Sequence, residues 1–251
     1  MLSVSQDIQP DDLINLKHQV PDQFDRIARG YDRATFFSQG YIKDLALSVR
    51  RMRLRGNEYL ADLCCGTGKS TACCLEVLPA GRVIAIDNSK EMLMMASHKF
   101  AARFSNEQLK FLQKDVMLLD FADNTFDAIF MAYGIRNMPD YERCLKNLLR
   151  QLKPGGTICF HEYALADSPL VRLYWRILGY LFIIPFSALI TGSTTLFRYL
   201  IRSVLQFPSP EKFVELLQNC GFQDCAAIPL SSWRRPILHT FLARKPGITL
   251  Q

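Results

Sequence analysis

The sequence feature that most constrains the fold is YLADLCCGTGKS, residues 59–70. The apolar run Tyr59–Leu63 is typical of a buried strand, and it ends just before a pair of glycines, Gly66 and Gly68. A helix-compatible stretch, residues 70–78, follows at once. Strand, glycine turn and helix in this order let the backbone approach a ligand closely and direct helix N-terminal amides toward it.

A second predicted strand ends in an acidic residue at the distance that a nucleotide site requires. The apolar run 82–86 leads into Asp87, nineteen residues after Gly68. A carboxylate at this place can accept hydrogen bonds from both hydroxyls of a ribose.

Three kinds of nucleotide loop compete for the glycine turn. A phosphate-binding P-loop needs a glycine where Leu63 stands, and a dinucleotide fingerprint needs one where Thr71 stands. An S-adenosylmethionine loop needs an acidic residue four positions before the first glycine, which Asp62 supplies, although Cys64 occupies a position where glycine is common. The Asp62 carboxylate would orient the loop and the amino-acid part of the cofactor. The turn alone is equally compatible with an ordinary tight turn, and Asp87 moves the balance toward a methyltransferase.

Composition excludes several classes of protein. With 251 residues, 49% of them hydrophobic and 22% charged, the chain is globular and large enough for one α/β domain with additions. The net charge of +6 is too dispersed to indicate nucleic-acid binding. The eight cysteines show no metal-binding Cys-x-x-Cys spacing, so we expect no metal and a reducing compartment.

No membrane-spanning or secreted segment is predicted. Residues 1–10 are polar and lack a secretory signal. The apolar stretch Ile177–Ile190 contains Pro185 and is shorter than the roughly 20 residues of a spanning helix. We therefore expect a cytoplasmic protein, with peripheral contact to a membrane and a homodimer both left open.

Apolar strand runs alternate with helical patterns over about 105 residues, which predicts βαβ units and a parallel sheet. We expect a helical cap at 1–55, a cofactor-binding α/β core at 56–164, an apolar helical insertion at 165–207, and a C-terminal helix and strands at 208–251 that complete a seven-stranded sheet. Ligands of such sheets bind at the carboxyl ends of the strands. The predicted strand ends are Asp87, Asp115, Tyr133 and His161.

The insertion, residues 165–207, is rich in aromatic residues interleaved with arginines. It can be a pair of helices that pack on the core. It can also be a lid over an apolar substrate or a surface that rests on a membrane.

Several stretches together resemble the ubiquinone/menaquinone biosynthesis C-methyltransferases, a family of class I S-adenosylmethionine-dependent enzymes. The stretches are FDRIARGYD (24–32), DLCCGTG (62–68), DNTFDA (123–128), YGIRNMPD (133–140), LKPGG (152–156) and FP (207–208). The resemblance implies a Rossmann-like α/β fold with helices on both faces of a mostly parallel sheet, and S-adenosyl-L-methionine as cofactor. It departs from the family at Tyr41, where histidine is usual, and at Lys69, where an acidic residue is usual. These departures leave the identity of the methyl acceptor open.

Loop chemistry and resemblance together give the expected site. The cofactor residues are Tyr31, Asp62, Gly66, Thr67, Gly68, Asp87, Asn88, Met92, Asp115, Val116 and Tyr133. Arg136 and Asn137 are expected beside the acceptor ring, as in the family, to stabilise a phenolate and to orient its hydroxyl. His161 is a candidate base, acting directly or through a water, and is equally compatible with a purely structural histidine. For Arg136 the structural alternative is an ion pair with Asp140.

The predicted reaction is methylation of a ring carbon of a prenylated benzoquinol or naphthoquinol, a hydrophobic small molecule. A ring carbon becomes a good nucleophile when a neighbouring phenolic hydroxyl loses its proton. Methylation of oxygen or nitrogen on another hydrophobic small molecule is the first alternative. A non-catalytic scaffold that keeps only the cofactor fold is the second.

Overall fold

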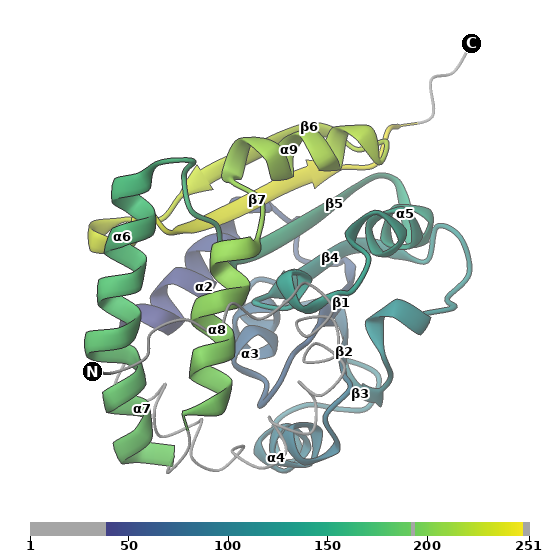
Figure 1. Cartoon of the computed structure of the whole chain (residues 1–251). Coiled ribbons are helices and arrows are strands. Elements are labelled where there is room, and N and C mark those ends of the chain that lie inside the picture. The colour runs from purple at the N-terminus through teal and green to yellow at the C-terminus, as the bar shows by residue number, and fades with distance from the viewer. Residues whose placement is uncertain (1–38, 192–193, 248–251) are drawn as a thin grey trace, which may run out of the picture.

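The computed structural model describes residues 39–191 and 194–247 and contains a seven-stranded sheet with helices on both faces (Figure 1). The strands are β1 (Tyr59–Leu63), β2 (Arg82–Asp87), β3 (Leu109–Gln113), β4 (Phe126–Ala132), β5 (Leu152–Tyr163), β6 (Gln223–Pro229) and β7 (Leu238–Arg244). Their order is β3-β2-β1-β4-β5-β7-β6. Strands β1 to β5 are parallel, and β7 is antiparallel to both of its neighbours. The predicted seven-stranded, mostly parallel α/β fold is confirmed.

The helices follow the predicted alternation with the strands. They are α2 (Gln39–Arg51), α3 (Lys69–Glu76), α4 (Lys90–Phe100), α5 (Tyr141–Gln151), α6 (Pro169–Leu178), α7 (Ile184–Thr191), α8 (Thr195–Gln206) and α9 (Pro210–Asn219). Short turns of other helix types are η1 (Val116–Leu118), η2 (Ile135–Asn137), the π-helical η3 (Gly179–Ile183) and η4 (Ser232–Arg234). Tyr31 and the stretch 24–32 lie outside the described residues.

Two hydrophobic clusters hold the helices to the two faces of the sheet. Helices α5 and α9 bury Leu145 and Phe213 against one face, and α2 and α3 bury Val49 and Cys74 against the other. Successive side chains of a strand point to opposite faces, so each buried strand contributes to both clusters. Burying one such large apolar side chain contributes roughly 1.5–3 kcal/mol.

Two local predictions are corrected. Asn88 and Glu91, three residues apart, predict a capping box at the start of α4, but the first turn is capped by Ser89, whose hydroxyl accepts from the amide of Met92. The turn residues Pro154, Gly155 and Gly156 predict a strand that begins at Thr157, but β5 begins at Leu152, because Leu152 already pairs with Phe126 ahead of a register shift.

The insertion forms a helical hairpin that stands beside the end of the sheet. Figure 1 shows α6 and α7 as one long rod with α8 alongside it. The two arms approach closely at Gly179, where an added Cβ would lie 2.3 Å from Cδ1 of Ile201. Trp175 and Ile201 are fully buried in a third hydrophobic cluster, shared with residues of the sheet end such as Leu238.

The structure corrects the prediction that the apolar stretch is too short for a membrane-spanning helix. Residues Pro169–Phe186 form one helix that is long and apolar enough, by length and composition alone, to cross a membrane. It starts eight residues before the apolar run Ile177–Ile190 and continues through Pro185. The wide turn η3 ends two residues before that proline, and such a turn accommodates a residue that cannot donate a backbone hydrogen bond.

Candidate functional site

A cavity of about 390 Å³ opens at the carboxyl ends of β1 to β4. This is where a parallel sheet is expected to bind its ligand. Its lining includes nine of the predicted site residues. They are Gly66, Thr67, Asp87, Asn88, Met92, Asp115, Val116, Tyr133 and Asn137.

The glycine loop turns sharply through left-handed backbone conformations. Cys64, Gly66 and Gly68 have φ angles of 55°, 54° and 83°. An added Cβ on Gly66 would meet nothing within 4 Å, whereas one on Gly68 would lie 2.6 Å from Phe100. Gly66 therefore keeps backbone accessible to a ligand, and Gly68 permits close packing of the loop on α4. Gly68 does not line the cavity.

Asp87 ties the end of β2 to the loop. Its Oδ2 accepts from the amide of Gly66 at 2.8 Å, and its Oδ1 accepts from the amide of Ser89 at 2.9 Å. Each carboxylate oxygen can accept more than one hydrogen bond, and hydroxyl groups of a ligand are suitable donors to it. The side chain lines the cavity, as a ribose-binding carboxylate must.

Asp62 lies behind the loop and is fully buried. Its Oδ2 accepts from the hydroxyls of Ser70 (2.9 Å) and Thr71 (2.6 Å). Its Oδ1 is buried without a hydrogen-bond partner among the residues that the structure describes. Burial raises the pKa of Asp62 to about 7, opposed by these two hydroxyl bonds. A cationic group or a bridging water on the loop side would satisfy the orphaned oxygen.

Apolar and acidic groups share the far wall of the cavity, beside β3. Val116 and Met92 are buried side chains on it. Asp115 caps η1 by accepting from the amide of Met117 at 2.8 Å. Asn88 is exposed at the rim, and its backbone carbonyl accepts from Gln113. A flat heterocycle with polar edges fits such a wall.

The opposite end of the cavity is aromatic. Tyr133 follows β4 with a φ of 56°, a left-handed conformation that is unusual for a bulky residue and is found at functional sites. Its ring stacks on Tyr41, with centroids 5.5 Å apart, and it contacts Tyr163 at 5.2 Å. Tyr163 in turn contacts Trp175 of the hairpin at 5.1 Å. The Nζ of Lys69 lies 5.7 Å from the centroid of the Tyr41 ring.

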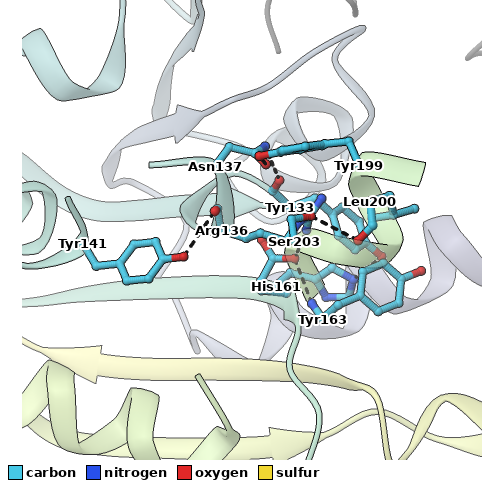
Figure 2. A network of polar contacts seen from close by, with 10 residues as sticks. Tyr133, Arg136, Asn137, Tyr141, His161, Tyr163, Tyr199, Leu200 and Ser203 are labelled. Carbon is cyan, nitrogen blue, oxygen red and sulfur yellow. Dashed lines mark hydrogen bonds and ion pairs between the residues drawn. The ribbon is translucent and has the colours of Figure 1, made fainter. Parts of the chain in front are cut away.

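Asn137 faces the cavity and is held between two elements. Its amide nitrogen donates to the carbonyl of Tyr133 at 3.3 Å, and its Oδ1 accepts from the hydroxyl of Tyr199 at 3.0 Å. Figure 2 shows Asn137 and Tyr199 pointing toward each other from η2 and α8. The hairpin thus helps to fix a predicted acceptor-site residue.

Arg136 is not brought to the cavity. Its guanidinium forms a buried ion pair with Glu162 of β5, and its Nε donates to Ser203 of α8 at 3.0 Å (Figure 2). Although burial acts against it, the Glu162 carboxylate raises the pKa of Arg136, so the guanidinium stays charged. The expected alternative, an ion pair with Asp140, does not form, because Asp140 instead caps α5. In this arrangement Arg136 holds the η2 turn that carries Asn137.

His161 is fully buried in β5 and also lies outside the cavity lining. Its Nε2 is 2.9 Å from the hydroxyl of Tyr133, and its Nδ1 is 2.7 Å from the hydroxyl of Ser48. Burial, with the nearby cations Arg51 and Arg234, lowers the pKa of His161 to about 3. A neutral imidazole so placed reaches a ligand only through Tyr133.

Some lining residues are absent from the predicted site. Tyr41 and Lys69 line the cavity, and their departure from the family pattern was the available signal for them. Tyr199 does not line the cavity but holds Asn137, and it carried no such signal, because nothing local to α8 indicates that its hydroxyl meets Asn137.

Comparison with known proteins places the chain in a family. A model of the ubiE/COQ5 methyltransferase family matches residues 14–231. The chain belongs to this family. It is an S-adenosylmethionine-dependent methyltransferase, which confirms the predicted family, enzyme class and cofactor.

Named relatives cover most of the chain. A demethylmenaquinone methyltransferase of Staphylococcus aureus is 34% identical over 211 residues, which span 82% of this chain and 86% of that protein. A demethylmenaquinone methyltransferase of Lactobacillus johnsonii is 29% identical over 223 residues, which span 84% and 89% of the two proteins.

Solved structures share the fold at low sequence identity. The cyclase SpnF aligns with a TM-score of 0.70 at 17% identity, over 92% of this chain and 96% of that one. A phosphoethanolamine N-methyltransferase of Haemonchus contortus, solved with S-adenosylhomocysteine, aligns with a TM-score of 0.67 at 16% identity, over 92% and 59% of the two chains.

The residues present fit S-adenosylmethionine. The orphaned Asp62 oxygen suits the cationic amino-acid end, directly or through a water. The Asp87 carboxylate lines the cavity and suits ribose hydroxyls, and the wall of Met92 and Val116 suits an adenine ring. The open space at Gly66 leaves room for close approach of the ligand to the loop.

Proposed function

We propose that the protein methylates a ring carbon of a reduced quinone that carries an apolar tail, a naphthoquinol of the demethylmenaquinol type. The single observation that carries this proposal is the aromatic column from Tyr41 through Tyr133 and Tyr163 to Trp175. It joins the cavity to the apolar hairpin, as a substrate with a flat ring and a long hydrocarbon tail requires. The names of the relatives, demethylmenaquinone methyltransferases, support the naphthoquinol ring.

In this proposal each residue binds the cofactor or the acceptor according to its position in the cavity. When bound, S-adenosylmethionine supplies an electrophilic methyl group on a cationic sulfur. Gly66, Asp87 and Asp62 hold the cofactor, and the aromatic end of the cavity holds the acceptor ring. Much of the rate enhancement in such a transfer comes from holding the two reactants at attack distance. Asn137, fixed by Tyr199, and the hydroxyl of Tyr133 are the polar groups that orient the ring oxygens.

We further propose that the long arm of the hairpin rests on a lipid surface from which the tail of the acceptor enters. Its outer stripe includes Leu170, Leu181 and Phe182, which are 77%, 66% and 62% exposed. Arg176, directly before Ile177 in the chain, is also exposed on this arm, and arginines beside apolar residues are typical of helices at anionic lipid interfaces. A second copy of the chain is the competing occupant, and the homodimer stays a prediction.

The reaction is tested with purified protein, methyl-deuterated S-adenosylmethionine and a demethylnaphthoquinol kept reduced. The expected product carries the labelled methyl on a ring carbon, located by fragmentation in mass spectrometry. A labelled methyl on oxygen would replace the proposal by O-methylation. Cofactor binding without transfer to any quinol, in a preparation that binds the quinol, would favour the scaffold alternative.

The lipid surface is tested by flotation with anionic liposomes. We expect the protein to float with the vesicles and the triple variant Leu170→Ser, Leu181→Ser, Phe182→Ser to stay behind. The matched control is the triple change at exposed polar positions of α9, Glu211→Ser, Lys212→Ser and Gln218→Ser. If the wild-type protein elutes as a dimer and does not float, the stripe is an interface between two copies.

A further inference from the structure

A chain of buried hydrogen bonds leads from the back of the sheet to the cavity. The Nη1 of Arg51 donates to the hydroxyl of Thr240 at 2.7 Å, and that hydroxyl lies 2.7 Å from the hydroxyl of Ser48. Ser48 then meets Nδ1 of His161, and Nε2 of His161 meets the hydroxyl of Tyr133. Figure 2 shows the last two members, His161 and Tyr133, in contact.

The sheet brings these five residues together from three elements and the loop after β4. His161 on β5 is in register with Thr240 on β7. Ser48 and Arg51 come from α2, which packs on this face. Tyr133 is turned onto His161 by its left-handed backbone, which the amide of Tyr133 stabilises by donating to the carbonyl of His161 at 2.8 Å.

The donor-to-acceptor direction of these hydrogen bonds is determined by Arg51, the first residue in the series. A guanidinium can only donate hydrogen bonds, and Arg51 is itself anchored by donating to the carbonyls of Ile228 and Pro229. The hydroxyl of Thr240 accepts from Arg51, and Ser48 is the one acceptor it has in the part of the chain that the structure describes. If Ser48 donated to Thr240 instead, the buried Thr240 hydroxyl would lack an acceptor, which is costly.

The same argument determines the donor and the acceptor of each following hydrogen bond. Ser48 receives the hydrogen of Thr240 and donates its own to Nδ1 of His161. Because His161 is neutral and one ring nitrogen accepts, the other nitrogen carries the hydrogen. His161 is therefore the Nε2–H tautomer and donates to the oxygen of Tyr133. The hydroxyl of Tyr133 has one hydrogen. Because its oxygen accepts from His161, this hydrogen is directed away from His161.

We propose that Arg51, Thr240, Ser48 and His161 form a positioning chain that makes the Tyr133 hydroxyl a hydrogen-bond donor toward a ring oxygen of the methyl acceptor. The acceptor part of this inference rests on the proposed function, and the tautomer part does not. A donor at that place stabilises the negative charge that the ring oxygen carries when the neighbouring carbon attacks. His161 then acts through Tyr133 and is not the base.

The tautomer is tested without any turnover, by nitrogen-15 NMR of histidine-labelled protein at neutral pH. The chain has four histidines, and His161→Gln identifies the signal of His161 by its loss. We expect the Nε2–H tautomer in the wild type and in Thr240→Ser, and a shift toward the Nδ1–H tautomer in Thr240→Val. An Nδ1–H tautomer or a protonated ring in the wild type would overturn the proposal.

The consequence for the reaction is tested by a double-mutant cycle. We expect Tyr133→Phe to lower kcat about tenfold with unchanged affinity for S-adenosylmethionine, since one transition-state hydrogen bond is lost. Thr240→Val should lower kcat several-fold in the wild type and not at all in Tyr133→Phe, and Thr240→Ser should restore it. Thr157→Val, the same substitution elsewhere in the sheet, is the matched control.

Equal losses from Thr240→Val in both backgrounds would assign Thr240 to packing alone and overturn the chain. If no quinol is methylated although the Nε2–H tautomer is found, the proposed function fails and the hydrogen-bond direction stands.

Discussion

The two ends of the cavity are built in different ways. At the cofactor end, a backbone loop with left-handed glycines and the carboxylates of Asp87 and Asp62 make the site, all within the sheet core. At the proposed acceptor end, Tyr41 of α2 stacks on Tyr133, and Tyr199 of the hairpin holds Asn137 of η2 from behind the cavity lining. On the assignment proposed above, the cofactor is bound by local backbone geometry, whereas the acceptor is bound by contacts between distant segments.

Asp87→Ala tests the cofactor end of the cavity most directly, and of all the variants we expect it to have the largest effect. The change removes a cavity carboxylate and the acceptor of two loop amides. Affinity for S-adenosylmethionine, measured by calorimetry, should fall about 100-fold, or about 3 kcal/mol. Binding of the quinol should be retained. An unchanged cofactor affinity would mean that the cofactor end does not depend on this strand end.

The two loop glycines form a matched pair with different expected defects. An alanine at Gly68 collides with buried Phe100, so Gly68→Ala should lower the free energy of unfolding by about 1–3 kcal/mol. An alanine at Gly66 meets open space and carries only the left-handed backbone cost of about 1–2 kcal/mol, but its methyl group enters the ligand space. Gly66→Ala should therefore weaken cofactor binding about tenfold more than its stability loss explains, as measured by calorimetry beside thermal unfolding. Equal losses of cofactor affinity in the two variants would contradict the different roles of Gly66 and Gly68.

The role of the hairpin in acceptor binding is tested by the variant Leu170→Ser, Leu181→Ser, Phe182→Ser, assayed with two acceptors. These side chains are exposed, so the fold should be unaffected. KM for a long-tailed quinol presented in vesicles should rise about tenfold, because the apolar contact with the lipid is lost. KM for a tail-less quinol in solution should not change. Equal changes for both acceptors would assign the stripe to another role.

A pH dependence gives the smallest expected effect and belongs to the cofactor end. The pKa of Asp62 is raised to about 7, so the protonated form is favoured in the folded, ligand-free protein. Its contribution to stability is greatest below the ordinary pKa of about 4 and is lost as the pH rises through 7. Binding of a cationic amino group needs the ionised form, so affinity for S-adenosylmethionine should rise several-fold from pH 5.5 to 7.5. Asp62→Asn should bind weakly and with a flat profile over that range; a profile as steep as that of the wild type would exclude Asp62 as the cause.

The sequence was sufficient for the parts of the molecule that are determined locally. The apolar run Phe126–Ala132 predicts a strand over those residues, and β4 has these limits, because the run is continuous and bounded by turn residues. Leu45, Val49 and Met52 recur at helical spacing in the sequence, and all three are buried on α2 or directly after it. The convergence of Asp87, Asp115 and Tyr133 on one cavity follows from the parallel topology alone.

What could not be predicted depends on residues that are far apart in the chain. Ser48 and His161 are 113 positions apart, and no local pattern indicates that they meet. The same holds for Arg136, whose partner is Glu162 on a neighbouring strand rather than the nearby Asp140. The hairpin rod was missed because Pro185 ends a helix in a local interpretation, while a π-helical turn accommodates it in the structure.

The third hydrophobic cluster has a consequence for how such enzymes can diversify. Trp175 and Ile201 lie in a cluster separate from the two that hold helices to the sheet, and this cluster includes Leu230, Ile237 and Leu238 near the sheet end. The hairpin can therefore be exchanged between related chains as a unit, provided that these contacts are kept and that Tyr199 and Ser203 are carried with it to meet η2. Chimeras that swap residues 165–207 should inherit the acceptor preference of the donor and keep the cofactor affinity of the host.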